Sequence, residues 1–168
     1  MEPEHFLVSR DENGAIRPWD PDGVDSLAKP CYDFRSMSPA MAYLQELTLA
    51  LNSLDWGVYQ CDHEDGNGQY EVNFDYADAL TTCDRVIFFK MASSQIAKKY
   101  GAIATHMPKP FADRTGSGLH AHYHLANAKS SKNLFIDNKD KRGLGCSQLA
   151  YHFIGGIMHH ARALCAVT

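Results

Sequence analysis

Cysteine pairs, long apolar runs and a surplus of basic residues are all missing from this sequence. Its five cysteines are scattered over 168 residues without a CxxC pair, which argues against a zinc ribbon or a disulfide framework and favours free thiols in a reducing cytoplasm. No apolar run approaches the roughly 20 residues that a membrane helix needs, and the first residues lack the pattern of a signal peptide. The 20 acidic residues outnumber the 16 basic ones, so nucleic acid is not an expected partner. We therefore expect a cytoplasmic protein that binds neither membranes nor nucleic acid.

Two common nucleotide-binding motifs are missing as well. The chain has neither a GxGxxG motif after a predicted strand nor a GxxxxGK[ST] motif, which argues against the Rossmann and P-loop folds. What is present is an ordinary globular composition, with 45% hydrophobic and 21% charged residues. A chain of 168 residues is enough for one domain with a hydrophobic core of its own.

Strand-like and helix-like segments alternate irregularly along the chain. The residue pattern predicts strands at 2–8, 58–62, 69–76, 102–106 and 119–126. It predicts one helix that begins with Ser38 as N-cap and Pro39 at the first position and runs to Leu54, and two more at 77–100 and 147–166. Surface loops are expected at 17–35 and 127–145. This order is typical of an α+β domain with a mainly antiparallel sheet.

Two groups of acidic residues stand on or beside predicted strands. Glu2 and Glu4 are two residues apart, so their carboxylates point to the same side of the first strand. Glu64 and Glu71 flank a glycine-rich turn that brings two strand ends together, so both can face one point. Each group alone is more often a charged strand edge or a polar turn than a binding site.

A third group follows a turn of small residues. The segment at 116–124 reads GSGLHAHYH, and its glycines allow the backbone to approach a ligand closely. His120, His122 and His124 alternate, which places them on one face of the strand predicted at 119–126. Histidines in this arrangement suit metal or phosphate binding as well as a structural role.

Together, the four glutamates and His120 form a donor set made mostly of hard oxygen ligands. Such a set favours Mg²⁺ or Mn²⁺ over Zn²⁺, and it has enough ligands for two ions. A two-metal carboxylate site is a common way to bind and polarise a nucleotide polyphosphate. The residues therefore point to metal-dependent chemistry on a nucleotide.

The same residues carry a resemblance to a known family. The chain resembles glutamine synthetases in segments that run in family order over nearly its whole length: EPE at 2–4, HEDGNGQYE at 63–71, ATHMPKP at 104–110, GSGLHAH at 116–122 and IGG at 154–156. The stretch from Lys109 to His120 matches the family's ATP-region signature. The variant HEDGNGQ is similar to the branch that contains bacterial type III-like glutamine synthetases and γ-glutamylmethylamide synthetases.

The resemblance implies a fold, a reaction and a site. The fold is a curved, mainly antiparallel sheet flanked by helices. In the reaction, ATP phosphorylates the γ-carboxylate of L-glutamate, and ammonia, or an alkylamine in some branches, then displaces the phosphate. One divalent ion, Mg²⁺ or Mn²⁺, is held by Glu4, Glu64 and Glu71, and a second with help from Glu2 and His120. The resemblance implies that His122 and His124 contact the nucleotide and that Thr115 and Gly116 contact the substrate glutamate.

The resemblance also implies that residues 1–168 are the central part of a catalytic domain. Family members carry an N-terminal β-grasp domain before the strand that begins here, and further catalytic-domain sequence after the last helix. We therefore expect the key acid–base and arginine residues of the reaction to lie outside this chain. The 168-residue chain alone is expected to be inactive, and the full-length protein is expected to be a large ring-shaped homo-oligomer.

Three other interpretations stay open. The first is a glutamate–methylamine ligase in place of a glutamate–ammonia ligase. The second is a catalytically inactive fragment that keeps at most metal or nucleotide binding. The third is an unrelated metal hydrolase built on His120, His122 and His124.

Overall fold

The structure, a computed structural model, describes residues 1–167. These residues form two compact units, of which the first spans Met1–Ala121 and the second begins at His122. The first unit holds a six-stranded sheet and the helices that cover it, and the second holds a long loop and one helix.

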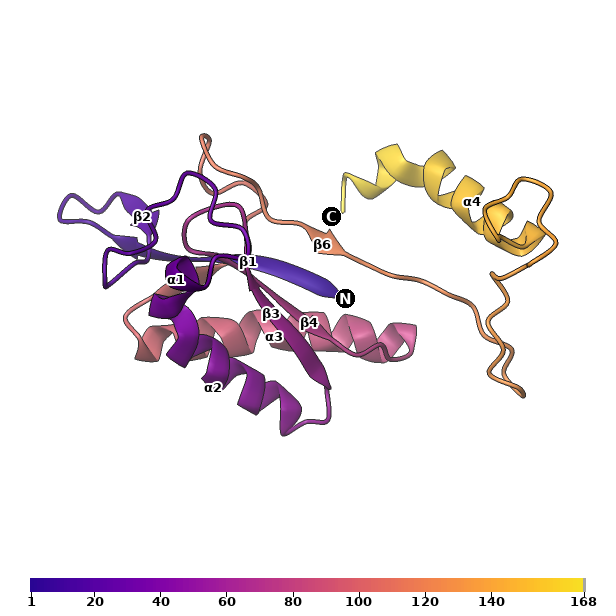
Figure 1. Cartoon of the computed structure of the whole chain (residues 1–168), viewed down its shortest axis with the longest axis horizontal. Coiled ribbons are helices and arrows are strands. Elements are labelled where there is room, and N and C mark those ends of the chain that lie inside the picture. The colour runs from indigo at the N-terminus through magenta and orange to yellow at the C-terminus, as the bar shows by residue number, and fades with distance from the viewer. Residues whose placement is uncertain (168) are drawn as a thin grey trace. The chain divides into compact units, whose positions relative to one another are not determined.

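The strand β1 (Glu2–Arg10) organises the sheet (Figure 1). It pairs in antiparallel fashion with four strands: β2 (Ile16–Pro18), β4 (Gln69–Phe74), β5 (Ile103–Thr105) and β6 (Leu119–His120). The strand β3 (Val58–His63) pairs with β4, again antiparallel. The expected α+β fold with a mainly antiparallel sheet is therefore confirmed.

Helices cover one face of this sheet. The helices α2 (Met41–Asn52) and α3 (Ala79–Lys99), labelled in Figure 1, pack against each other. α2 also lies on β3, and α3 lies on β5. Asp78 caps α3 by accepting hydrogen bonds from the N–H groups of Leu80 and Thr81. Burial of large apolar side chains between the helices and the sheet supplies the main stabilising term, from Leu7, Tyr43, Leu47, Tyr70, Val72, Phe74 and Phe89 among others.

The alternation of side chains along β1 and β4 separates the core from the opposite face of the sheet. Leu7 of β1 and Tyr70 and Val72 of β4 belong to the core beneath the helices. The intervening residues of both strands therefore point to the other face, and they include Glu2, Glu4, Phe6, Gln69 and Glu71. This second face carries the charged residues that the sequence singled out.

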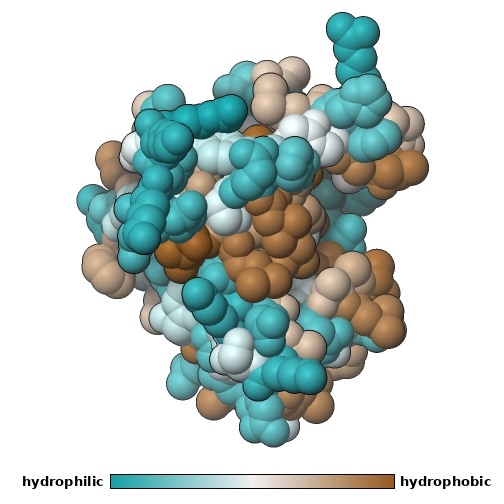
Figure 2. Space-filling view, turned by 90° about the vertical axis from the view of Figure 1, so that its right-hand side faces the viewer, coloured by the Kyte–Doolittle hydropathy of each residue, from teal (hydrophilic) through white to brown (hydrophobic). Residues whose placement is uncertain are grey.

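The second unit is built around α4 (Gln148–Leu164), whose N-cap Ser147 accepts a hydrogen bond from the N–H of Ala150. The loop before it is organised by Asp140, which accepts hydrogen bonds from the Tyr151 hydroxyl at 2.6 Å and from several backbone N–H groups. These bonds lower the pKa of Asp140 to about 2. Apolar residues of α4 reach the surface, with Met158 73% exposed, and Figure 2 shows brown, apolar residues at the surface among teal, polar ones.

The predicted start of the first of the three predicted helices, at Ser38, is wrong. Ser38 is not an N-cap, because Asp33 caps a short helix, α1 (Phe34–Met37), through a 2.7 Å hydrogen bond from the N–H of Ser36. The chain then passes through a 3₁₀ turn, η1 (Ser38–Ala40), directly into α2. The loop expected at 17–35 therefore includes the beginning of α1 and the end of β2.

The strand predicted at 119–126 is also shorter than expected. β6 ends at His120, and its pairing with β1 places Glu2 opposite His120 and Pro3 opposite Leu119. His122 and His124 lie beyond the end of β6, at the start of the second unit. They therefore do not share a strand face with His120.

Two smaller observations complete the fold. All five cysteines carry free thiols, as expected. Over the described part of the chain, none of the helices combines the length and the apolar character that a membrane crossing requires.

Candidate metal and substrate site

Strand register brings four of the predicted ligands to one face of the sheet. Glu4 of β1 lies opposite Glu71 of β4, and Glu2 of β1 lies opposite His120 of β6. Directly opposite residues of antiparallel strands point to the same side, and Glu2 and Glu4 are two residues apart on one strand. Three separate strands therefore bring together residues more than 60 positions apart in sequence on this face.

Ligand atoms converge most closely at Glu2, Glu71 and His120. One donor atom from each of these residues lies within 4.8 Å of the others. The Oε2 of Glu2 and the Nδ1 of His120 are 3.3 Å apart. Glu71 is buried, whereas His120 is exposed. Two carboxylates and one imidazole at this spacing suit a divalent cation such as Mn²⁺.

The acidic residues of this face repel one another. Burial raises the pKa of Glu64 to about 7, and the neighbouring carboxylates of Glu4 and Glu71 push it in the same direction. Burial also raises the pKa of Glu71; a hydrogen bond from Asn73 partly opposes this rise, and Glu4 and Glu2 add to it. This is the electrostatic pattern of a cation site, because a bound cation would relieve the repulsion.

Gly118 leaves room for the side chains of Glu4 and His120. A Cβ added to Gly118 would lie 3.0 Å from Oε1 of Glu4 and 3.0 Å from Nε2 of His120. The N–H of Glu4 also donates to the carbonyl of Gly118 at 3.1 Å, so the backbone is held close to the site. A larger residue here would enter the space between the two predicted ligands. The sequence pointed to this close approach through its turn of small residues.

Gln69 ties the acidic face to the loop that carries Thr115 and Gly116. Its fully buried side chain donates from Nε2 to Oε2 of Glu4 at 2.9 Å and to the carbonyl of Gly116 at 3.0 Å. Its Oε1 accepts from the N–H of Gly66 at 2.9 Å. Residue-by-residue reasoning missed Gln69 as a site residue, although it lies inside the motif that the sequence highlighted.

The loop at 107–118 is attached to the same turn at several further points. Thr115 donates from Oγ1 to Oδ2 of Asp65 at 3.4 Å, and the Arg114 guanidinium donates to Oδ1 of Asn67. The predicted glutamate-binding residues Thr115 and Gly116 therefore lie beside the turn between Glu64 and Glu71. His122 and His124, the predicted nucleotide contacts, belong to the second unit and are exposed.

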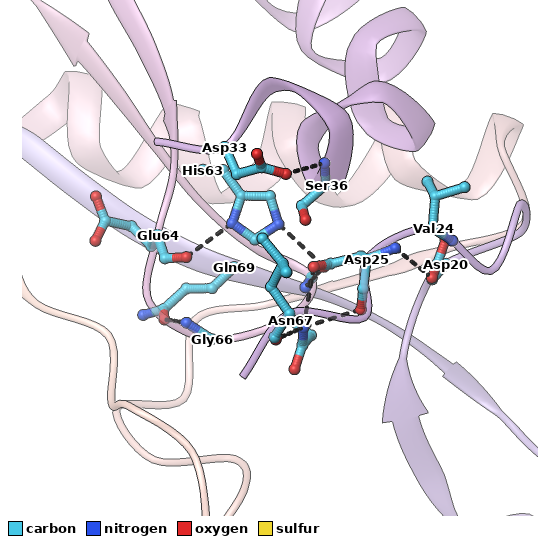
Figure 3. A network of polar contacts seen from close by, with 12 residues as sticks. Asp20, Val24, Asp25, Asp33, Ser36, His63, Glu64, Gly66, Asn67 and Gln69 are labelled. Carbon is cyan, nitrogen blue, oxygen red and sulfur yellow. Dashed lines mark hydrogen bonds and ion pairs between the residues drawn. The ribbon is translucent and has the colours of Figure 1, made fainter. Parts of the chain in front are cut away.

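A buried polar network lies behind the turn (Figure 3). His63 Nε2 donates to Oδ2 of Asp25 at 3.0 Å, and Nδ1 donates to the carbonyl of Glu64 at 2.7 Å. The side chains of His63 and Asp25 are 0% and 1% exposed. Both ring nitrogens of His63 therefore face acceptor oxygens, which holds the ring in one orientation. The sequence pattern predicted that Asp25 lies in a surface loop, and no motif indicated that it is buried.

The catalytic-domain family of glutamine synthetase matches residues 1–168. The chain belongs to the glutamine synthetase family. Glutamate–methylamine ligase of Methyloversatilis universalis is 48% identical over 167 residues, which cover 99% of this chain and 37% of that protein. Glutamine synthetase of Rhizobium meliloti is 44% identical over 168 residues, which cover 100% of this chain and 37% of that protein.

Solved structures of the glutamine synthetase family have the same fold as this chain. A structure described as apo GmaS without ligand superposes with a TM-score of 0.82 at 42% identity, covering 99% of this chain and 37% of that one. A Plasmodium falciparum glutamine synthetase superposes with a TM-score of 0.74 at 26% identity, covering 98% of this chain and 36% of that one. The chain thus spans little more than a third of the length of these relatives, and the resemblance found in its motifs is confirmed at the level of the family.

Proposed function

We propose that this chain is the central part of the catalytic domain of an ATP-dependent ligase that joins L-glutamate to ammonia through a γ-glutamyl phosphate. The observation that carries the proposal is the register of β1, which gathers Glu2, Glu4, Glu71 and His120 on one face of the sheet. Membership of the glutamine synthetase family supports the reaction class. In this account, the remaining acid–base and arginine residues come from parts of the protein outside residues 1–168.

The donor set supports a role for two divalent ions, Mg²⁺ or Mn²⁺. Glu4, Glu64 and Glu71 would hold one ion, and Glu2 and His120 would contribute to the second. When bound, such ions supply positive charge that offsets the charge of ATP and of the phosphoryl group in transfer. Two observations support this set: the ligand atom of Glu71, in the first group, lies within 4.8 Å of those of Glu2 and His120, in the second, so the two groups adjoin, and the glutamates repel one another.

The chain's other residues have proposed roles in binding and orientation. Thr115 and Gly116 contact the substrate glutamate, because their loop is attached to the turn that precedes Glu71. His122 and His124 contact the nucleotide. Gln69 holds the carboxylate of Glu4 and the carbonyl of Gly116 in a fixed relation. Orienting the γ-carboxylate of glutamate toward the γ-phosphorus of ATP reduces the entropic part of the barrier.

Methylamine is the second candidate amine. The specific observation in its favour is the 48% identity to the glutamate–methylamine ligase of M. universalis, beside 44% to a glutamine synthetase. Both amines attack the same acyl phosphate, so the residues described here serve either reaction. The proposed assembly, a large ring-shaped homo-oligomer in the cytoplasm, is the same for both.

The test is a coupled assay of ADP release by the complete gene product. It contains ATP, L-glutamate and Mg²⁺ or Mn²⁺, with ammonia or methylamine as the amine. We expect ADP release to require glutamate, a divalent ion and an amine, and to be faster with ammonia. Faster turnover with methylamine would favour the second candidate. No amine-dependent ADP release, or Zn²⁺-dependent ester hydrolysis in its place, would contradict the proposal.

A further inference from the structure

The turn between Glu64 and Glu71 is anchored from a segment far from it in the sequence. Asp25 lies about 40 residues before the turn, in the loop between β2 and α1, yet it is only 7% exposed. Its Oδ2 accepts from His63 Nε2 at 3.0 Å and from the N–H of Gly68 at 2.7 Å. Its Oδ1 accepts from Nδ2 of Asn67 at 2.9 Å. One carboxylate therefore holds two positions of the turn, Asn67 and Gly68, and the last residue of β3, His63 (Figure 3).

Asp25 is itself held in place. Its N–H donates to Oδ2 of Asp20 at 2.9 Å, and the N–H of Val24 donates to Oδ1 of Asp20 at 3.2 Å. Burial alone would raise the pKa of Asp25, but the hydrogen bonds from His63, Asn67 and Gly68 outweigh it and the pKa lies below its usual value. The anchor is thus an ionised carboxylate with its oxygens satisfied.

The anchor lies behind the acidic face and contributes no ligand to it. His63 pairs with Tyr70 across β3 and β4, and Tyr70 belongs to the core, so the ring of His63 points away from the side of Glu71. The anchor is connected to the acidic face through the backbone, because His63 Nδ1 donates a hydrogen bond to the backbone carbonyl of Glu64 at 2.7 Å. Fixing that carbonyl fixes the backbone from which the Glu64 carboxylate projects.

The same network reaches the loop that carries Thr115. Asn67 donates from Nδ2 to the carbonyls of Asp25 and Leu27 at 2.9 Å and 3.0 Å. Its Oδ1 accepts from the guanidinium of Arg114, the residue before Thr115. Asn67 is therefore held on one side by the Asp25 loop and holds the 107–118 loop on the other.

We propose that Asp25 is a positioning residue, which through His63 and Asn67 sets the geometry of Glu64 and of the loop at 114–116. The inference rests on the proposed function in one respect, since it takes the acidic face to be a divalent-ion site. Removal of the carboxylate should weaken the ion held by Glu4, Glu64 and Glu71 and leave the ion held by Glu2 and His120 nearly unchanged. A residue that acted only on folding would weaken both ions alike.

The main experiment compares Asp25→Asn with Asp22→Asn, a change at an exposed residue of the same loop. Mn²⁺ binding to the complete gene product is followed by electron paramagnetic resonance, without any substrate. We expect roughly 10- to 100-fold weaker binding of one class of Mn²⁺ in Asp25→Asn, the size typical of residues that orient metal ligands. Asp22→Asn should match the wild type.

A second variant covers the case in which Asp25→Asn does not fold, since breaking a buried ion pair is strongly destabilising. Asn67→Ala leaves the pair of Asp25 and His63 intact but releases the 107–118 loop. We expect the KM for glutamate to rise about tenfold or more, with kcat changed less. Unchanged Mn²⁺ binding in a folded Asp25→Asn, or an unchanged KM for glutamate in Asn67→Ala, would overturn the inference. Absence of Mn²⁺ binding by the wild type would instead contradict the proposed function.

Discussion

Glu4 and Glu71 lie directly opposite each other on neighbouring antiparallel strands, on the face of the sheet that α2 and α3 leave uncovered. Two acidic residues in cross-strand register destabilise a sheet by like-charge repulsion. This arrangement is therefore costly for the protein without a cation, and it is favourable only where a ligand of opposite charge binds. The relationship connects strand register with the proposed chemistry.

The first prediction concerns this repulsion. Glu71→Gln removes one charge but keeps an amide oxygen that can accept the hydrogen bond from Asn73. In EDTA we expect the variant to be more stable than the wild type by about 0.2–1 kcal/mol, the size of a cross-strand charge pair. With Mn²⁺ we expect the wild type to gain more stability than the variant. Thermal unfolding of the complete protein measures both differences.

The control for this prediction is Glu12→Gln, at an exposed residue of the turn between β1 and β2. It changes the net charge by the same amount and should show neither effect. A Glu71→Gln variant that is less stable in EDTA and equally stabilised by Mn²⁺ would speak against a cation site at this face.

The second prediction concerns the space beside Glu4. In Gly118→Ala the new methyl group would lie 3.0 Å from both Oε1 of Glu4 and Nε2 of His120. We expect Mn²⁺ binding to weaken about tenfold or more, as for other changes that displace ligand side chains. The unfolding midpoint in EDTA should change little, because both side chains can move when no ion holds them.

Gly155→Ala in α4 is the matched control, because nothing lies within 4 Å of the added Cβ. This change should leave Mn²⁺ binding unaltered and stabilise the helix slightly. Equal Mn²⁺ affinities for the two alanine variants would show that Gly118 does not shape the site.

The third prediction is a pH dependence of stability. Burial, with a smaller contribution from the charge of Lys90, lowers the pKa of His106 to about 4. Its ring stacks on that of His5 at 5.7 Å and shares a 3.0 Å hydrogen bond with the hydroxyl of Ser93. The unfolded chain binds a proton at His106 near pH 6.5 and the folded chain does not, so stability is present above pH 6.5 and falls as the pH drops toward 4.

His106→Phe should remove the part of this dependence that comes from His106; fully buried His5, whose pKa burial lowers to about 3, contributes its own part in both proteins. Between pH 7.5 and 5 the wild type should lose about 2 kcal/mol of unfolding free energy through His106 alone. The total loss in the variant should therefore be smaller than in the wild type by about 2 kcal/mol. Urea unfolding at the two pH values measures the difference. The hydroxyl of Ser93 keeps a partner in the carbonyl of Lys90, so the variant should remain folded. The same loss in both proteins would show that His106 does not control acid stability.

Local patterns in the sequence were sufficient for most of the fold. The residue pattern predicted helices at 77–100 and 147–166, within two residues at each end of α3 and α4, because helix boundaries carry local signals such as Gly101 after α3. The alternating pattern did not predict the length of β6, because strand length depends on pairing with another strand, here Glu2 and Pro3 of β1. The role of Ser38 was missed because Asp33, five residues earlier, is the residue that accepts the capping hydrogen bond.

In the candidate site, too, local motifs predicted some residues and did not predict others. Glu2, Glu4, Glu64, Glu71 and His120 were predicted as ligands because carboxylates and imidazoles at strand spacing are unusual and because the family motifs contain them. Asp25 was not found, because its function depends on contacts with residues 38 to 43 positions away. A single acidic residue in a loop rich in Pro, Asp and Gly carries no local sign of burial.

Counting Mn²⁺ ions on the complete gene product shows directly whether the face of the sheet opposite α2 and α3 binds divalent ions. Electron paramagnetic resonance gives free and bound Mn²⁺ during a titration. The account predicts two bound ions per chain in the wild type and loss of at least one of them in Glu71→Gln, with Glu12→Gln unchanged. A wild type that binds no Mn²⁺, or a Glu71→Gln variant that binds the same number with the same affinity, would contradict it.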